Sequence, residues 1–307
     1  MSSTVIKKGM EVIPYLAERW PQLYLLPTEE GNPHYRSVVL AGEDAPVHSL
    51  SHFQRSDDDI VTMEETPAGE VMAVTLSKRC DFEMLLQILA YKCTTTVIPA
   101  TQGASILDGL INFHKIRDHE ASFRKEEAEK GNLDPDWDSE FKRFTSDRRN
   151  YTEALIILSK GPYSAFPYTK TPWSEAQWLD YSQIIRKYHE CTHFICRRLY
   201  REWIDALWDE LAADAVGICA ALHTYDQKLA EQFLGIENST YIGGRLENYM
   251  SEAERTPEAL NQAAAEIHEV LNRFSAWINT ESFKDPWDLV VRLEEHYPLW
   301  WKKKTEA

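Results

Sequence analysis

The sequence lacks a long hydrophobic run and an excess of positive charge. Its longest uninterrupted apolar stretch, Ala215 to Leu222, is far shorter than the roughly 20 residues that a helix needs to cross a bilayer. Lys and Arg number 33 against 49 Asp and Glu, which gives a net charge of −16. Nucleic acids and anionic membranes bind clustered positive charge. We therefore expect no membrane span, and neither a nucleic acid nor a membrane as the main partner.

Cysteine is also scarce. The chain has five cysteines in 307 residues, with no CxxC pair, at Cys80, Cys93, Cys191, Cys196 and Cys219. An odd number of thinly spread cysteines suits reduced thiols in a cytoplasm better than a disulfide framework. The first residues show no apolar run followed by a small-residue cleavage site, so we expect no export signal. These absences predict a cytoplasmic protein.

The composition that is present is that of an ordinary globular protein. The chain is 43% hydrophobic, 27% charged and 11% aromatic, and this aromatic content is too high for intrinsic disorder. A length of 307 residues is close to the size at which a single hydrophobic core stops growing. The sequence therefore permits one large domain or two smaller ones.

The first part of the chain, residues 1–116, has the pattern of an α/β region. Residues 71–76 predict a strand, and residues 82–91 carry apolar side chains at helical spacing. Residues 94–98 are a second, β-branched apolar segment that ends at a proline. Residues 104–114 again have the spacing of a helix. No motif in this region points to a chemistry, so its role stays open.

A highly charged segment follows. From Arg117 to Arg149, 18 of 33 residues are charged, 8 of them basic and 10 acidic. A mixture of both signs favours an exposed helical connection over an interaction tail. We expect residues 117–150 to connect the α/β region to a second domain at residues 151–307.

The second half is predicted to be mainly helical after one short strand at residues 154–158. Ser174 and Gln177 have the form of a capping box, which predicts a helix from there to about Leu199. A second helix is expected from about Glu202 to Leu222, and a third from Thr256-Pro257. The expected buried face of the third helix is Leu260, Ala264, Ile267, Leu271, Phe274 and Ile278. The fold class that these elements predict is α+β.

The first of these helices contains an HExxH motif, His189-Glu190-Cys191-Thr192-His193. Two histidines four residues apart lie one turn apart on the same helix face, so both imidazoles can reach one metal ion. Glu190 lies between them and can contact a water molecule at that ion. Cys191 lies about 200° around the helix from His189, so we expect a packed thiol rather than a ligand.

Glu210 is the candidate for a third metal ligand, and Asp214 is the candidate for a residue that holds one of the histidine rings. Catalytic zinc takes three protein ligands and leaves a fourth position for water. If the chain reverses near Tyr200, the two helices are antiparallel, and residues whose numbers sum to about 401 face each other. Glu210 then faces the midpoint of the two histidines, and Asp214 lies near His189, where it can hold the second ring nitrogen.

With these residues the sequence resembles the gluzincin branch of zinc metallopeptidases, across about residues 150 to 222. The resemblance implies that His189, His193 and Glu210 bind zinc and that Glu190 is the general base. It also implies that Asp214 orients a ligand histidine.

The resemblance further implies an oxyanion stabiliser and a strand that binds substrate. Tyr241, Arg245 and Tyr249, in a glycine-containing loop, are the candidates for the oxyanion, and His223 is a weaker one. Residues 154–165 occupy the place of the substrate-binding edge strand, although a buried core strand explains them equally well.

Together these observations predict a zinc-dependent hydrolase that cuts a peptide or protein substrate, or a non-peptide amide. Zinc-activated water would attack the carbonyl, with Glu190 as base. The alternative is a catalytically silent scaffold or regulatory binding protein that keeps the same fold.

Overall fold

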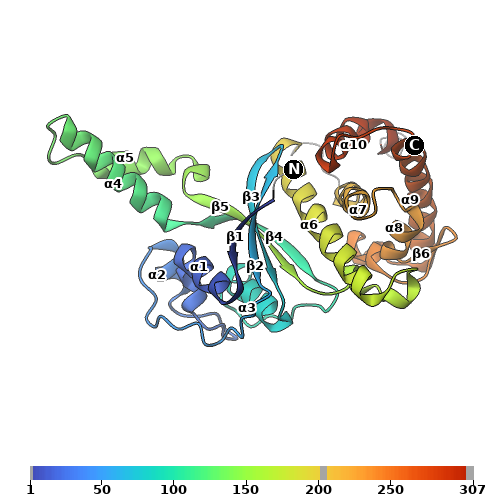
Figure 1. The fold of residues 1–307 in the computed structure, drawn as a ribbon, viewed down its shortest axis with the longest axis horizontal. Coiled ribbons are helices and arrows are strands. Elements are labelled where there is room, and N and C mark those ends of the chain that lie inside the picture. The colour runs from blue at the N-terminus through green and yellow to red at the C-terminus, as the bar shows by residue number, and fades with distance from the viewer. Residues whose placement is uncertain (1–2, 201–205, 302–307) are drawn as a thin grey trace.

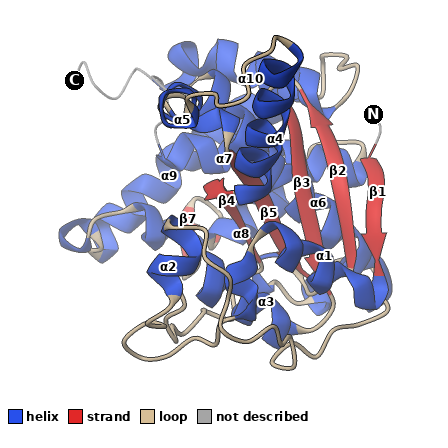
Figure 2. Cartoon of the chain, turned by 90° about the vertical axis from the view of Figure 1, so that its left-hand side faces the viewer, coloured by secondary structure: helices blue, strands red, loops and turns tan. Residues whose placement is uncertain are grey.

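The computed structural model describes residues 3–200 and 206–301. Figure 1 shows a twisted sheet at the centre of the molecule, the C-terminal helices on one side of it and a helical arm projecting on the other side. The same sheet and its covering helices are seen from the side of the arm in Figure 2. This mixed arrangement confirms the α+β class. Within the described residues, no helix is both long and apolar enough to span a bilayer.

Seven strands and ten α-helices make up the described chain. The strands are β1 Ser3–Lys8, β2 Ile60–Thr66, β3 Gly69–Leu76, β4 Ala104–Ile111, β5 Thr152–Ser159, β6 Ile236–Glu237 and β7 Thr240–Tyr241. The helices are α1 Val12–Arg19, α2 Tyr35–Leu40, α3 Arg79–Leu89, α4 Phe113–Glu129, α5 Trp137–Thr145, α6 Glu175–Leu199, α7 Ala206–Leu222, α8 Gln227–Leu234, α9 Pro257–Ile278 and α10 Pro286–Trp301.

The main sheet has the order β1-β2-β3-β5-β4. Only the β3–β5 pair is parallel, and the other neighbours are antiparallel. Strands β3 and β4 precede the charged segment and β5 follows it, so the sheet joins the two parts of the chain. The expected domain ranges themselves stay a prediction.

The sheet separates two hydrophobic cores. Side chains alternate between the faces of a strand, and in β5 Leu155 and Ile157 pack toward α1 and α3. Ile156 and Leu158 pack on the other face, toward α6 and the helices that follow it. All four are fully or almost fully buried, which explains why this central strand is continuously apolar.

The predicted strand at residues 71–76 and the predicted helix at residues 82–91 are confirmed as β3 and α3. The prediction of a helix at residues 104–114 is wrong, because these residues form β4 and the start of α4. A β-bulge between Leu107 and Leu110 inserts one extra residue relative to β5. That residue changes a two-residue alternation into a spacing that imitates a helix.

Two further apolar segments, the β-branched one at residues 94–98 and the one at residues 154–165, differ in structure. Residues 94–98 form no strand, and Thr94 makes only an isolated bridge to Thr28. Val97 of this segment is 92% exposed, whereas Ile98 is buried in the core on the α1 and α3 side of the sheet. The strand at 154–158 is confirmed as β5, and because it has a neighbour on each side, it is the buried core strand rather than the substrate-binding edge, the two interpretations that the sequence left open. The edges of the sheet are β1 and β4.

The charged segment forms the arm of Figure 1, built from α4 and α5. Ile116 is the one buried residue of α4, and α5 has none, so the expected exposed helical connection is confirmed. The two helices hold each other through aromatic side chains, including a stacked pair of His119 and Phe144.

The helical predictions for the second half agree with the structure. Ser174 and Gln177 form the capping box at the start of α6, which ends at Leu199 as expected. Thr256 caps α9, and all six residues of its predicted buried face are buried. The second predicted helix, from about Glu202 to Leu222, corresponds to α7. Its expected start lies outside the described residues, and the described part of α7 ends at Leu222.

Candidate metal centre

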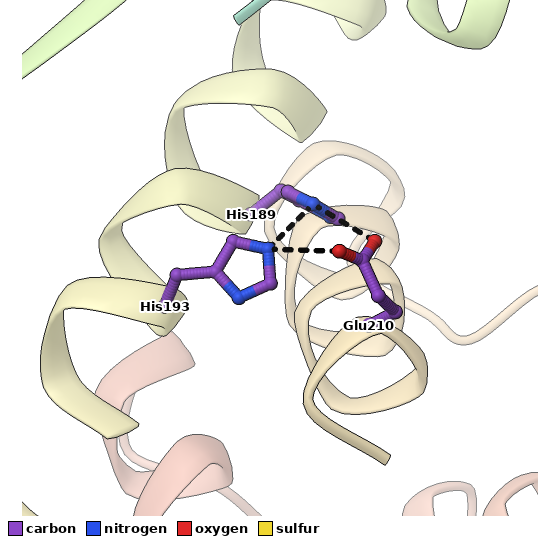
Figure 3. A group of neighbouring side chains, drawn as sticks. All are labelled: His189, His193 and Glu210. Carbon is purple, nitrogen blue, oxygen red and sulfur yellow. Dashed lines mark hydrogen bonds and ion pairs between the residues drawn. The ribbon is translucent and has the colours of Figure 1, made fainter. Parts of the chain in front are cut away.

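Helices α6 and α7 bring His189, His193 and Glu210 together (Figure 3). The two Nε2 atoms are 3.0 Å apart, and the Glu210 carboxylate oxygens lie 3.5 Å from His189 Nε2 and 3.6 Å from His193 Nε2. Both histidine side chains are buried, and the Glu210 side chain is 21% exposed. These three side chains, predicted from the sequence, therefore form a cluster that can hold a metal ion.

A glycine sets the close approach of the two helices. A Cβ atom at Gly217 of α7 would lie 2.7 Å from the carbonyl oxygen of Ile185 in α6. Such a contact is far inside the ordinary separation of two heavy atoms. Gly217 therefore allows the helix backbones to meet one turn beyond Asp214, close to the cluster.

The distances fit a tetrahedral ion. Zinc binds imidazole nitrogen and carboxylate oxygen at about 2.0–2.2 Å, so ligand atoms of a tetrahedral site are separated by about 3.3–3.5 Å. The two nitrogens are 3.0 Å apart, and each lies near that value from a different oxygen of Glu210, His189 at 3.5 Å from Oε2 and His193 at 3.6 Å from Oε1. The donor set, two imidazoles and one carboxylate, is also one that zinc accepts.

A carboxylate stands behind each ring. His193 Nδ1–H donates to Asp209 Oδ2 at 2.7 Å, and His189 Nδ1 lies 3.0 Å from Asp214 Oδ1. These contacts place the proton of each neutral ring on Nδ1, so both Nε2 atoms present lone pairs to the shared space. Two lone pairs 3.0 Å apart beside a carboxylate repel one another unless a cation lies between them.

The acid–base properties of the cluster agree with this need for positive charge. Burial alone lowers the pKa of His193, but the hydrogen bond with Asp209 and the charges of Asp209 and Glu210 raise it to about 9. Burial opposes ionisation of Asp214 as well, yet Arg245 and His189 hold the pKa of that carboxyl at about 2. Without a metal, a proton on His193 supplies the cation that the carboxylates require.

Tyr163 and Arg245 complete the surroundings of Asp214. The Tyr163 hydroxyl donates to Asp214 Oδ1 at 2.6 Å and lies 2.8 Å from His189 Nδ1. The Arg245 guanidinium forms an ion pair with Asp214 and donates to the Tyr163 oxygen at 3.3 Å. Burial and the Asp214 charge raise the pKa of Tyr163, so its hydroxyl stays protonated. The position of His189 is thus fixed by a buried network.

The candidates for the oxyanion stabiliser lie at different places relative to the cluster. Tyr249 donates to Glu210 Oε2 at 2.8 Å, so its hydroxyl lies at the cluster. Arg245 is bound to Asp214 instead, on the far side of the ring of His189. The Tyr241 hydroxyl bonds Gly244 and Glu247 within its own loop, and His223 is exposed at the end of α7.

Glu190 is buried, with 8% of its surface exposed, and its charge contributes to the raised pKa of His193. Cys191 is fully buried in the core on the other side of α6, as expected for a packed thiol. The HExxH segment therefore divides its side chains between the cluster and the core as the helical geometry predicts.

Two residues of this network were missed in the sequence. The antiparallel pairing also predicts Asp209, because residue numbers that sum to about 401 place it opposite position 192, beside His193. Only its neighbour Glu210 was predicted to be a ligand. Tyr163 follows from no spacing, since it comes from the short segment Tyr163–Ala165 after β5, where Ser164 has φ +53° and Ala165 has φ +54°. Loop paths of this kind leave no periodic signal.

Comparison with known proteins places the chain in one family. Residues 4–294 match DUF7005, a family of unknown function, and the chain belongs to that family. No curated protein matches the chain, and neither does any solved structure.

Proposed function

We propose that this protein is a zinc-dependent hydrolase that cleaves a peptide bond or another amide bond. The observation that carries the proposal is the convergence of His189 Nε2, His193 Nε2 and the Glu210 carboxylate, with a carboxylate behind each ring. Three protein donors are typical of catalytic zinc, whereas structural zinc takes four. The resemblance of the HExxH and Glu210-x-x-x-Asp214 motifs to gluzincins supports the same interpretation.

In this proposal His189, His193 and Glu210 hold the zinc. Bound there, the ion supplies Lewis acidity to a carbonyl and acidifies water. Glu190 accepts the proton of the attacking water and delivers it to the leaving nitrogen. Tyr249, whose hydroxyl donates to Glu210 Oε2 in this structure, would turn this hydrogen bond toward the negative oxygen that develops.

The Asp209 and Asp214 carboxylates have a different task, which is to keep the two rings in the tautomer that binds metal. A carboxylate on the second nitrogen fixes ring orientation and raises the basicity of the ligand nitrogen. Arg245 and Tyr163 in turn hold Asp214 ionised and in place. These four residues are positioning residues rather than reacting groups.

One observation favours the alternative of a silent scaffold. Glu190, His189 and His193 are each at most 8% exposed and the Glu210 side chain is 21% exposed, so little of the cluster is open to a substrate. A scaffold with the same cluster binds zinc but cleaves nothing.

The test is a cleavage assay with a mixed peptide library on zinc-loaded protein, read by mass spectrometry. We expect the wild type to cleave, and Glu190→Gln to keep one zinc per chain while losing at least about 100-fold in turnover. Glu175→Gln is the matched control, since Glu175 is exposed on the same helix. A zinc-loaded wild type that cleaves no peptide or amide contradicts the proposal and leaves the scaffold.

A further inference from the structure

A second site is indicated by a large cavity on the molecule, here called the basic cavity. It has a volume of about 1100 Å³ and lies where α1, the start of β5, the base of the arm and the end of α6 meet. Six lining side chains are cationic: Arg19, Lys115, Arg148, Arg149, Arg197 and Arg198. Three are acidic: Glu70, Asp108 and Glu153. Arg149 forms an ion pair with Asp147 at 2.6 Å, and the excess of positive charge that remains is opposite in sign to the chain's net charge of −16.

Two of these cations share a single carboxylate oxygen. Arg19 Nη1 and Lys115 Nζ both lie 3.4 Å from Glu153 Oε1. The side chains of Arg19 and Glu153 are 30% and 17% exposed, so this group is largely shielded from water. Among the described residues, Arg19 Nε and the second carboxylate oxygen of Glu153 are both buried without a hydrogen-bond partner. One carboxylate therefore compensates two positive charges only in part.

Two further cations of the basic cavity form no ion pair among the described residues, and a third has only a long one. Arg148 and Arg197 form no ion pair within the part of the chain that the structure describes, and Arg198 reaches Asp108 only at 3.5 Å. Gly109 lies in the β4 bulge with φ +83°, and a Cβ atom there would come within 3.3 Å of Arg148 Nη2. The guanidinium of Arg148 thus lies over the β4 backbone at a place that a glycine keeps open.

The type of side chain indicates the ligand. Five of the six cations are arginines, whose planar guanidinium binds phosphate and carboxylate through two parallel hydrogen bonds. The cations come from several separate elements, which suits a ligand with more than one anionic group. The rest of the lining includes the apolar side chains Met63, Ala68, Met72, Ala154 and Leu199, which can cover a less polar part of a ligand.

From these contacts we infer that the basic cavity binds a small polyanion with two or more phosphate or carboxylate groups. The lining residues of the cavity include none of the metal cluster. The inference is therefore independent of the proposed hydrolase activity.

The test is isothermal titration of the full-length protein with tripolyphosphate and, separately, with citrate at constant ionic strength. We expect saturable binding of at least one of them with one site per chain. If only tripolyphosphate binds, the ligand carries phosphate groups. If citrate binds equally well, the ligand class includes carboxylates. Arg148→Gln and Arg197→Gln each weaken binding at least about fivefold, because each removes a charge-assisted contact. Both side chains are exposed and form no ion pair among the described residues, so we expect both variants to fold. The charge of Arg197 also helps to lower the pKa of Asp209, so Arg148→Gln is the variant that leaves the metal cluster untouched.

Two controls make the outcome decisive. Arg36→Gln removes the same charge from an exposed position on α2, outside the basic cavity, and leaves binding unchanged. Both probes also chelate metals, so the titration is repeated with His193→Ala, in which binding persists if it occurs in the basic cavity. The inference is overturned if neither probe binds saturably, if Arg36→Gln weakens binding as much as Arg148→Gln, or if binding disappears in His193→Ala that retains its fold.

Discussion

Each imidazole of the cluster is fixed on both sides, by a carboxylate on Nδ1 and by its neighbours on Nε2. The contacts of His193 with Asp209 and of His189 with Asp214 orient the two histidines so that both can bind one metal ion. A pair of surface histidines at the same spacing keeps its tautomers undetermined. The buried carboxylates therefore distinguish this HExxH segment from a chance occurrence of the motif.

The role of Asp209 gives the first prediction. Asp209→Asn keeps the size of the side chain but removes the negative charge behind His193, so we expect zinc affinity to fall about 10- to 100-fold. Competition with a chromophoric chelator measures the change. Asp180→Asn, at an exposed position on α6, the helix that carries His193, is the control and should leave the affinity at the wild-type value. Equal affinities for Asp209→Asn and wild type would show that the contact does not orient His193.

Tyr163 gives a second prediction. Tyr163→Phe leaves the buried ring in place and removes the hydroxyl that bonds Asp214 and His189. Loss of one buried hydrogen bond to a charged group lowers the free energy of unfolding by about 1.5–3 kcal/mol. Urea denaturation of the metal-free protein measures this. The same change at Tyr168, which is 41% exposed, should cost far less, and equal losses would argue against the network.

At the scale of single residues, the sequence predicts those whose positions follow from the geometry of a helix. His189, His193, Glu210 and Asp214 follow from one helical spacing and one antiparallel pairing. Tyr163 and Tyr249 do not, because they reach the cluster from short 3₁₀ segments whose path depends on the whole fold.

At the scale of elements, the contact between α6 and α7 positions the cluster. Gly217→Ala tests it, because the added methyl group would clash with the Ile185 carbonyl. Helix propensity alone predicts that alanine stabilises α7 by about 1 kcal/mol. We expect the opposite sign, a loss of about 1–3 kcal/mol from overpacking, together with weaker zinc binding. Thermal unfolding decides the sign, and a stabilised variant would contradict the close approach.

A buried carboxylate of α10 offers a prediction that depends on pH. Glu294 accepts a hydrogen bond from Trp208 Nε1 at 3.0 Å, and burial raises its pKa, with the charge of Asp209 adding to the shift. Below a pH of about 4.5, the pKa of this carboxyl in the unfolded chain, the group is neutral in both states. Above that pH the carboxyl ionises more readily in the unfolded state than in the folded state, so the free energy of unfolding falls. Glu294→Gln keeps an acceptor without the charge.

We therefore expect Glu294→Gln to raise the melting temperature at pH 8 and to have little effect at pH 4. The comparison is made by calorimetry at both pH values. Glu295→Gln, the same change at the adjacent, exposed position, is the control. A variant that is destabilised at pH 8 would contradict the cost of burying this charge.

The error at residues 104–114 also belongs to this scale. A single extra residue in the β4 bulge changes the apolar spacing from that of a strand to that of a helix. The partner that reveals the bulge, β5, lies more than forty residues further along the chain, so a local pattern cannot detect it.

At the scale of the whole molecule, one sheet supports a hydrophobic core on each face, and the helices of the cluster pack on one of these faces. β5 returns after the arm to lie between β3 and β4, and its face toward the C-terminal half packs against the helices that carry the cluster. The order of the strands depends on this long-range return, which is why the sequence predicts the class of fold and most helices but not the sheet. The chain's belonging to DUF7005 adds no function to this account.

The central claim is that His189, His193 and Glu210 hold a zinc ion. The most direct measurement is the zinc content of the native purified protein and of His193→Ala by elemental analysis. The account predicts one zinc per chain in the native protein and none in the variant. A native protein free of metal, or a variant that keeps its zinc, would contradict it.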